Sequence, residues 1–116
     1  MQSGDIEEVQ FEYVSAEELR RRFNDGKYWD RARFGDLWQR PEEEGHPNPP
    51  ESGDPFCTLS QILSYRDDQA RQIARVHQYL RPDGTIGGSA GRPDPKELLE
   101  DGVVYAVIEI PAAEGD

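Results

Sequence analysis

TLSQILSYRDDQARQIARVHQYL, residues 58–80, carries the strongest periodic pattern in the chain. Its apolar residues recur at helical spacing, while most of its charged residues fall between them. The apolar positions are Leu59, Ile62, Leu63, Ala70, Ile73, Val76 and Leu80. We therefore predict an amphipathic helix here, closed by Pro82-Asp83-Gly84. Because Asp67 or Asp68 can cap a second segment, one long helix and two abutting helices both stay open.

After this stretch, the chain shows a second set of helix signals and then a strand pattern. Asp94 precedes Pro95 and stands three residues before Glu97, which combines an N-cap, a proline at the first helical position and a capping-box acid. This predicts a short helix over residues 95–100. VVYAVIEI, residues 103–110, is β-branched and apolar on both sides, which predicts a buried strand.

A strand and a helix are also expected before residue 58. VQFEYV, residues 9–14, alternates apolar and polar residues with period two, as in a half-buried strand. Ser15 stands three residues before Glu18, so we predict a capped helix from about Ala16 to the turn at Asn24-Asp25-Gly26. Residues 27–40 fit a helix interrupted at Gly35 or a loop with two short turns.

The expected fold is a small single α+β domain over residues 1–116. It has a two- or three-stranded sheet with its first and last strands paired, packed by one long helix and short helices. Residues 41–55, PEEEGHPNPPESGDP, contain no large apolar residue and predict a flexible loop within that domain. The expected core is Val9, Phe11, Leu19, Phe23, Ile62, Leu63, Ile73, Val76, Leu80, Leu98, Val104, Tyr105, Ala106 and Ile108.

The composition sets limits on function. The chain has 116 residues, of which 34% are hydrophobic and 32% charged, and its net charge is −11. One cysteine, Cys57, excludes an internal disulfide and a cysteine-rich zinc site. The residues show no spacing typical of a metal site or a cofactor site, so we expect neither. The sequence shows no secretory signal and no apolar run of membrane-spanning length, which favours a cytoplasmic protein without membrane contact.

The glycine-rich run GTIGGSAGR, residues 84–92, is in the general place of an anion-binding loop. It matches neither the Walker nor the Rossmann pattern, and Asp94 and Glu97 compete with an anion at the helix predicted next. Turn chemistry is therefore the favoured interpretation. The run still holds more small residues than a turn needs, so close backbone approach to a partner or to the core stays a hypothesis for Gly87, Gly88, Gly91 and Arg92.

Arginines and aromatic residues form the best basic patch of the sequence. It contains Arg20, Arg21, Arg22, Arg31, Arg33 and Arg40, with Tyr28 and Trp29 interleaved. Such a mixture suits single-stranded nucleic acid or a protein hot spot. With 24 acids for 13 bases, pairing of these arginines with nearby acids is favoured, and direct binding to nucleic acid is disfavoured.

The hypothesis for function is a non-enzymatic protein-binding module that engages a basic protein partner, as an inhibitor or regulator of nucleic-acid machinery that mimics nucleic acid by its acidic surface. Its expected contacts are Glu42, Glu43, Glu44, Glu51 and Asp54, with Trp29 or Trp38 as apolar anchors. The first alternative is a small enzyme or toxin-like factor acting on nucleic acid or nucleotides through His77, Arg75 and Tyr79. The second is a structural subunit of a larger assembly.

Overall fold

The computed structural model describes residues 10–45, 55, 57–87 and 91–108. Within them the chain forms six strands and two helices. In chain order they are β1 (Gln10–Val14), α1 (Ala16–Asp25), α2 (Tyr28–Phe34), β2 (Trp38–Gly45), β3 (Leu59–Arg66), β4 (Gln72–Leu80), β5 (Asp94–Glu100) and β6 (Val103–Val107). Neither α1 nor α2 has the length and apolar character of a membrane-crossing helix.

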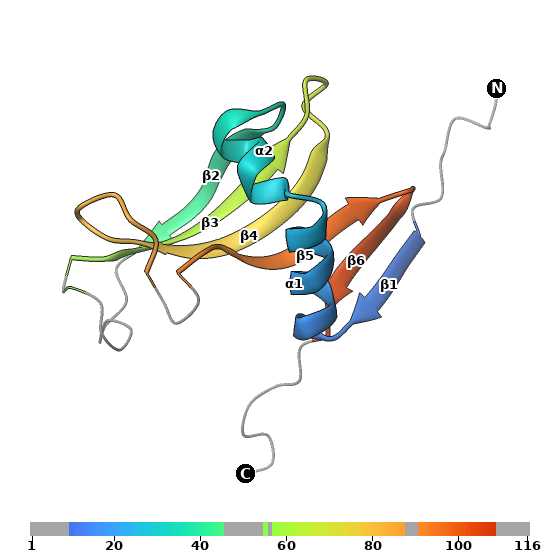
Figure 1. Cartoon of the computed structure of the whole chain (residues 1–116), viewed down its shortest axis with the longest axis horizontal. Helices are drawn as coiled ribbons and strands as arrows, with labels where there is room; N and C mark the ends of the chain where they lie inside the picture. The colour runs from blue at the N-terminus through green and yellow to red at the C-terminus, as the bar shows by residue number, and fades with distance from the viewer. Residues whose placement is uncertain (1–9, 46–54, 56, 88–90, 109–116) are drawn as a thin grey trace, which may run out of the picture.

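The strands form one mixed sheet in the order β1-β6-β5-β4-β3-β2. Its neighbours are antiparallel except for the parallel pair β1 and β6. In Figure 1, α1 lies in front of β5, and α2 lies beside the upper end of the β2–β4 part of the sheet. The expected two- or three-stranded sheet packed by a long helix is therefore wrong.

The stretch 58–80 is a long β-hairpin, which corrects the predicted helix. β3 pairs with β4 in antiparallel register, with Leu63 opposite Val76 and Tyr65 opposite Ala74. The connecting turn is fixed by Asp67, whose Oδ1 accepts the backbone N–H groups of Gln69 and Arg71 at 2.9 Å each. An aspartate that bonds the backbone a few residues onward favours a turn over a continuing helix.

Residues 94–100 form strand β5, so the second predicted helix is also wrong. Pro95 sits where the register between β4 and β5 shifts, between Arg75 and Val76, and such an irregularity tolerates a residue without an N–H. Asp101 and Gly102, with φ of 51° and 79°, form the turn to β6. Two consecutive positive φ values are the geometry of a two-residue hairpin turn. The Asp-Gly pair ends a strand here and not a helix.

Other expectations are confirmed. Residues 10–14 and 103–107 are strands, and they pair from Gln10 with Val103 to Val14 with Val107. The predicted helix begins at Ala16, and the Ser15 hydroxyl accepts the N–H of Glu18 at 3.1 Å. Residues 27–40, which the sequence left open, contain α2 and the start of β2. By contrast, residues 41–45 of the flexible loop predicted over 41–55 belong to strand β2, where they pair with β3. Residues 46–54 lie outside the described chain.

The core lies between the helices and one face of the sheet. Its buried apolar residues are Leu19, Phe23, Tyr28, Leu37, Leu63, Tyr65, Ala74, Val76 and Leu98. Five of them were expected, whereas two other expected residues, Phe11 and Ile108, are 57% and 53% exposed. Phe11 belongs to the end strand β1, where neither helix covers it. Val9 lies outside the described residues.

Candidate functional site

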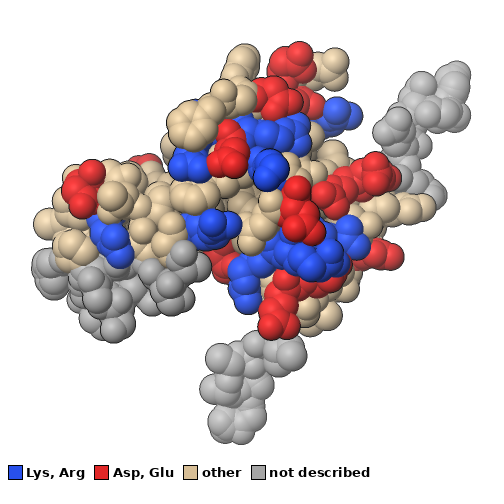
Figure 2. Space-filling view, viewed as in Figure 1, with Lys and Arg blue, Asp and Glu red and all other residues tan. Residues whose placement is uncertain are grey.

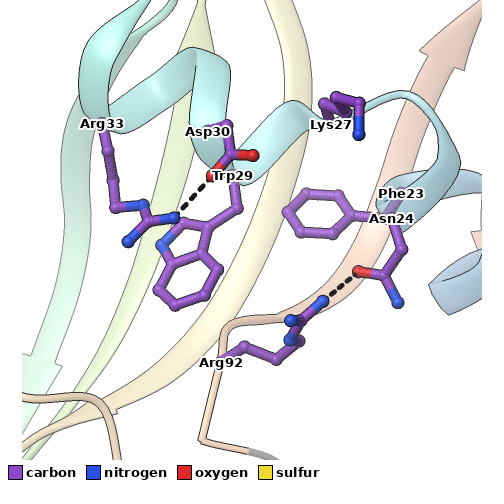
Figure 3. A pocket seen from close by; sticks show the side chains of 7 residues that line it. All are labelled: Phe23, Asn24, Lys27, Trp29, Asp30, Arg33 and Arg92. Carbon is purple, nitrogen blue, oxygen red and sulfur yellow. Dashed lines mark hydrogen bonds and ion pairs between the residues drawn. The ribbon is translucent and has the colours of Figure 1, made fainter.

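Two adjoining hollows meet at Trp29, and together they are called the tryptophan cleft. The smaller, shown in Figure 3, measures about 90 Å³ and is lined by Phe23, Asn24, Lys27, Trp29, Asp30, Arg33 and Arg92. The larger measures about 480 Å³ and is lined by Trp29, Arg33, Gln39, Gln78, Leu80, Gly84, Thr85, Ile86 and Gly91. The cleft therefore draws residues from α1, α2, two strands and the connection between β4 and β5.

A tight junction between α1 and α2 places Trp29 at the cleft. α1 is capped at Gly26, and any side chain there would collide with the ring of Tyr28. Lys27 then adopts a left-handed conformation, with φ of 57° and ψ of 36°, and α2 begins at the next residue. The Tyr28 ring stacks on Phe23 with centroids 6.0 Å apart. This packing fixes the start of α2 and so the position of the indole.

Two guanidinium groups lie against the indole of Trp29. The Arg33 guanidinium carbon is 3.8 Å from the ring centroid, and that of Arg92 is 5.5 Å away. Arg33 is held by Asp30, whose Oδ1 is 2.5 Å from Nη2. Arg92 donates from Nη1 to the side-chain oxygen of Asn24 at 2.8 Å. Figure 3 shows Arg33 beside the indole and Arg92, from a different part of the chain, pointing toward Asn24.

The cleft concentrates cations that lack a carboxylate partner. Most other cations in the described chain form ion pairs with acids: Arg20, Arg21, Arg22, Arg31, Arg33, Arg66, Arg71, Arg75 and Lys96. By contrast, neither Lys27 nor Arg92 lies within ion-pair distance of a carboxylate of the described chain. Figure 2 shows the cations of this face gathered over the helices and interleaved with acids. Arg40 also has no described carboxylate partner, but it lines neither hollow.

Buried amides fix the sheet side of the cleft. Gln78 donates to the side-chain oxygen of Gln61 at 2.8 Å, and Gln61 donates to Glu44 at 2.7 Å. Both glutamines are 7% exposed. Because each buried amide has a partner, the row is a rigid polar strip in an otherwise apolar layer. Gln78 faces the larger hollow and can present the rest of its amide to a ligand.

A third hollow of about 340 Å³ is lined by Tyr28, Arg31, Ile73, Leu99, Glu100 and Asp101. Three of its polar side chains, Tyr28, Arg31 and Glu100, are already paired. The Tyr28 hydroxyl donates to Glu100 at 2.9 Å, and burial, together with this carboxylate, raises the pKa of Tyr28 to about 12. Arg31 binds Asp36, and this hydrogen bond lowers the pKa of Asp36. The third hollow thus offers less uncommitted charge than the tryptophan cleft.

The predicted acidic contacts that the structure describes, Glu42, Glu43 and Glu44, are consecutive residues of β2. Glu42 is ion-paired with Arg75 at 3.2 Å and with Arg66 at 3.7 Å, and Glu44 is bound to Gln61. Glu43 is exposed on β2, where Trp38 is 65% exposed. Glu51 and Asp54 lie outside the described residues.

Part of the predicted glycine-rich loop does reach the cleft. Gly91 lines the larger hollow, and Arg92 lines the smaller one. Gly87 is buried, and its N–H donates to the carbonyl oxygen of Tyr79 at 2.7 Å. Gly88 lies outside the described residues. Trp29, Gly91 and Arg92, which the sequence singled out separately, are therefore brought together.

The alternative catalytic residues lie on β4. Arg75, His77 and Tyr79 are two residues apart, so a strand places them on one face, and the rings of His77 and Tyr79 are 4.7 Å apart. His77 Nε2 lies 2.8 Å from the hydroxyl of Ser60, a residue that the sequence did not single out. Arg75 forms an ion pair with Glu42. Neither Ser60 nor His77 lines any of the three hollows.

Sequence reasoning missed Lys27, Asn24 and Gln78 as residues of the cleft. The Asn24-Asp25-Gly26 turn was the available signal, because a sharp reversal after a helix exposes the residues beside it. No group of three His, Cys, Asp or Glu side chains in the described part of the chain is placed to hold a metal ion. Comparisons with protein-family models, with curated proteins and with solved structures found no match.

Proposed function

We propose that this chain is a non-enzymatic binding protein whose tryptophan cleft takes a small organic anion. The anionic group, a carboxylate or phosphate, sits at Lys27 and Arg92. A flat or apolar portion of the same ligand lies along Trp29 in the larger hollow. The observation that carries this proposal is that two cations without carboxylate partners in the described chain line the smaller hollow, which shares Trp29 and Arg33 with a hollow of about 480 Å³.

The charges of the smaller hollow support an anionic ligand. Lys27, Arg33 and Arg92 stand against one carboxylate, Asp30. Arg92 uses one hydrogen-bond donor on Asn24, which leaves four N–H groups for a second acceptor. Guanidinium groups bind carboxylates and phosphates through two parallel hydrogen bonds, and these charge-assisted bonds are among the stronger ones in proteins. A volume of about 90 Å³ accommodates such a group without the rest of the ligand.

The larger hollow supports the second half of the ligand. Its volume lies in the range typical of small-molecule sites, and it combines Leu80 and Ile86 with the polar groups of Gln78 and Thr85. Trp29 lies between the two hollows and offers its ring to both. A ligand of one charged end and one apolar end therefore matches the order of the residues along the cleft.

The experiment uses the two tryptophans of the chain. Trp38→Phe leaves Trp29 as the one indole, so quenching of its emission reports on the cleft. The probes are 1-anilinonaphthalene-8-sulfonate, which carries an aromatic system and an anion, and its neutral relative N-phenyl-1-naphthylamine. We expect the anionic probe to bind more tightly than the neutral one. Arg92→Gln should lower the affinity for the anionic probe about tenfold or more, as loss of a hydrogen bond to a charged group does.

Arg40→Gln is the matched control, because it removes the same charge from an arginine outside the cleft. It should leave the affinity of both probes unchanged. Equal weakening by Arg40→Gln and Arg92→Gln would show that the probe responds to the overall charge, and the proposal would then be wrong. Equal affinity for the anionic and neutral probes would exclude the anion subsite.

Engagement of a basic protein partner is a second proposal. It is supported by the net charge of −11 and by Trp38, which is 65% exposed beside the acidic segment of β2. Glu43 is the acid of that segment without a partner in the described chain, whereas Glu42 and Glu44 already have partners in the fold. Affinity capture on Trp38→Ala and on the unchanged chain, at low and moderate salt, tests this idea. Identical recovery of partners at both salt concentrations would count against it.

A further inference from the structure

The two edges of the sheet differ in how well they are protected against pairing with another strand. β2 forms one edge and carries Pro41, three consecutive glutamates and a register shift between Pro41 and Glu43. Proline, bulges and charge are the usual devices that block an edge. β1 forms the other edge and has neither a proline nor a bulge: its five residues contain no proline and pair with β6 without interruption.

The side chains of β1 also lack cover. Phe11 and Tyr13 are 57% and 67% exposed, and their register partners on β6 are the small residues Val104 and Ala106. Val14 packs against the core, so Phe11 and Tyr13 point to the sheet face away from the helices. Large aromatic side chains at an edge are left open on the side where the next strand would lie. No further strand of the described chain takes that place.

We propose that the free edge of β1 binds an extended, basic segment of a protein partner as a seventh strand. Backbone hydrogen bonds from β1 supply the affinity, as in other complexes formed by strand addition. Apolar side chains of the segment cover Phe11 and Tyr13, and a lysine or arginine lies opposite Glu12. This inference is independent of the tryptophan cleft, and it relies on the basic-partner proposal only for the sign of the segment's charge.

Charge selects the occupant. Glu12 is exposed and has no ion-pair partner in the described chain. A lysine or arginine on the added strand, opposite Glu12, therefore forms a new ion pair with it. A second copy of this chain brings its own net charge of −11. The antiparallel register that sets Phe11 against Tyr13 of the copy also sets the two Glu12 carboxylates side by side, which is destabilising. A basic segment therefore fits this edge better than a second copy.

The test uses the synthetic peptide TVKVKVT, its acidic counterpart TVEVEVT and a form of TVKVKVT that is N-methylated at its five central residues. Binding is followed through the backbone amide NMR shifts of the full chain. We expect TVKVKVT to shift the amides of residues 10–14 and the N-methylated form to leave them unchanged. Glu12→Lys should weaken the binding of TVKVKVT by about two- to fivefold and strengthen the binding of TVEVEVT, as expected for an exposed charge pair.

Asp68→Lys is the matched control, since it makes the same charge change at an exposed residue of the turn between β3 and β4, outside β1. It should leave the affinity of TVKVKVT unchanged. Shifts that persist with the N-methylated peptide would overturn strand addition. Equal affinity for TVKVKVT and TVEVEVT would overturn the basic occupant. If the chain alone sediments as a dimer, and Glu12→Lys changes that dimerisation, the edge binds a second copy instead. None of these outcomes bears on the tryptophan cleft, whose probes report separately.

Discussion

Leu98 and Leu99 provide a direct test of the strand that replaces the predicted helix at residues 94–100. In a strand, adjacent side chains point to opposite faces of the sheet. Leu98 is fully buried in the core, with Ala74 and Tyr105 as its register partners, whereas Leu99 is only partly buried. Substituting each leucine by alanine therefore removes the same atoms from two unlike environments.

The expected losses follow from the packing. Leu98→Ala removes three buried carbons, worth about 0.8 kcal/mol each in transfer free energy. The space left behind adds about 1 kcal/mol, because surrounding core atoms relax only in part. We expect the free energy of unfolding to fall by about 3 kcal/mol for Leu98→Ala. Leu99→Ala gives up part of the transfer contribution and leaves no enclosed cavity, so we expect about 1 kcal/mol.

Urea unfolding followed by tryptophan fluorescence measures both losses. With a denaturant slope of about 1.5 kcal/mol per molar, the midpoint should fall by about 2 M for Leu98→Ala and by less than about 1 M for Leu99→Ala. Far-ultraviolet circular dichroism on each folded variant is the control for an intact sheet. Equal losses for the two variants, or a larger loss for Leu99→Ala, would refute the assignment of opposite faces.

Three further predictions concern single groups. Gly102→Ala should lower the free energy of unfolding by about 1 kcal/mol, because Gly102 has φ of 79°, while Gly45→Ala, in open space on β2, should cost much less in the same urea titration. Tyr65→Phe should leave stability unchanged or raise it by up to about 1 kcal/mol, since the buried Tyr65 hydroxyl has no partner in the described chain; a loss above about 1 kcal/mol would point to a bonded hydroxyl. The pKa of Tyr28 is about 12 in the folded chain and about 10 in the unfolded chain, so the unfolded state ionises first and stability should fall as the pH rises from 10 to 12. The slope is at most about 1.4 kcal/mol per pH unit and smaller with solvent screening, and Tyr28→Phe should remove that part of the pH dependence in alkaline unfolding titrations.

Local signals predicted some elements and misled at others. The alternation of residues 10–14 predicted the strand but not its buried face, since Phe11 and Tyr13 are exposed. The serine cap at residue 15 led to the correct helix, because a side-chain cap is decided within a few residues. Residues 58–80 fit two periods, since Leu59, Leu63, Val76 and Leu80 satisfy both a helical stripe and one face of a hairpin. The turn at Asp67 decides between them, and the sequence reasoning treated that aspartate as a helix cap.

The cap signal at Asp94 failed for a different reason. It describes the preference of an isolated segment, and pairing of residues 94–100 with strands on both sides outweighs that preference. The candidate site was predictable only in pieces for a related reason. Trp29 and Arg92 were each singled out, but they are far apart in sequence, and their contact depends on the α1–α2 junction and the β4–β5 connection. No periodic pattern encodes such a contact.

The parallel pairing of β1 with β6 has a consequence for how the chain folds. Its register partners, such as Gln10 and Val103, are 93 residues apart, whereas the β3–β4 and β5–β6 hairpins close over short turns. Contacts between distant residues carry the larger loop-closure entropy and therefore form late. Until β1 docks, the apolar segment Val103–Val107 is itself an open edge. Refolding yield should thus decrease with protein concentration, because another unfinished chain can occupy the place that β1 takes in the native sheet.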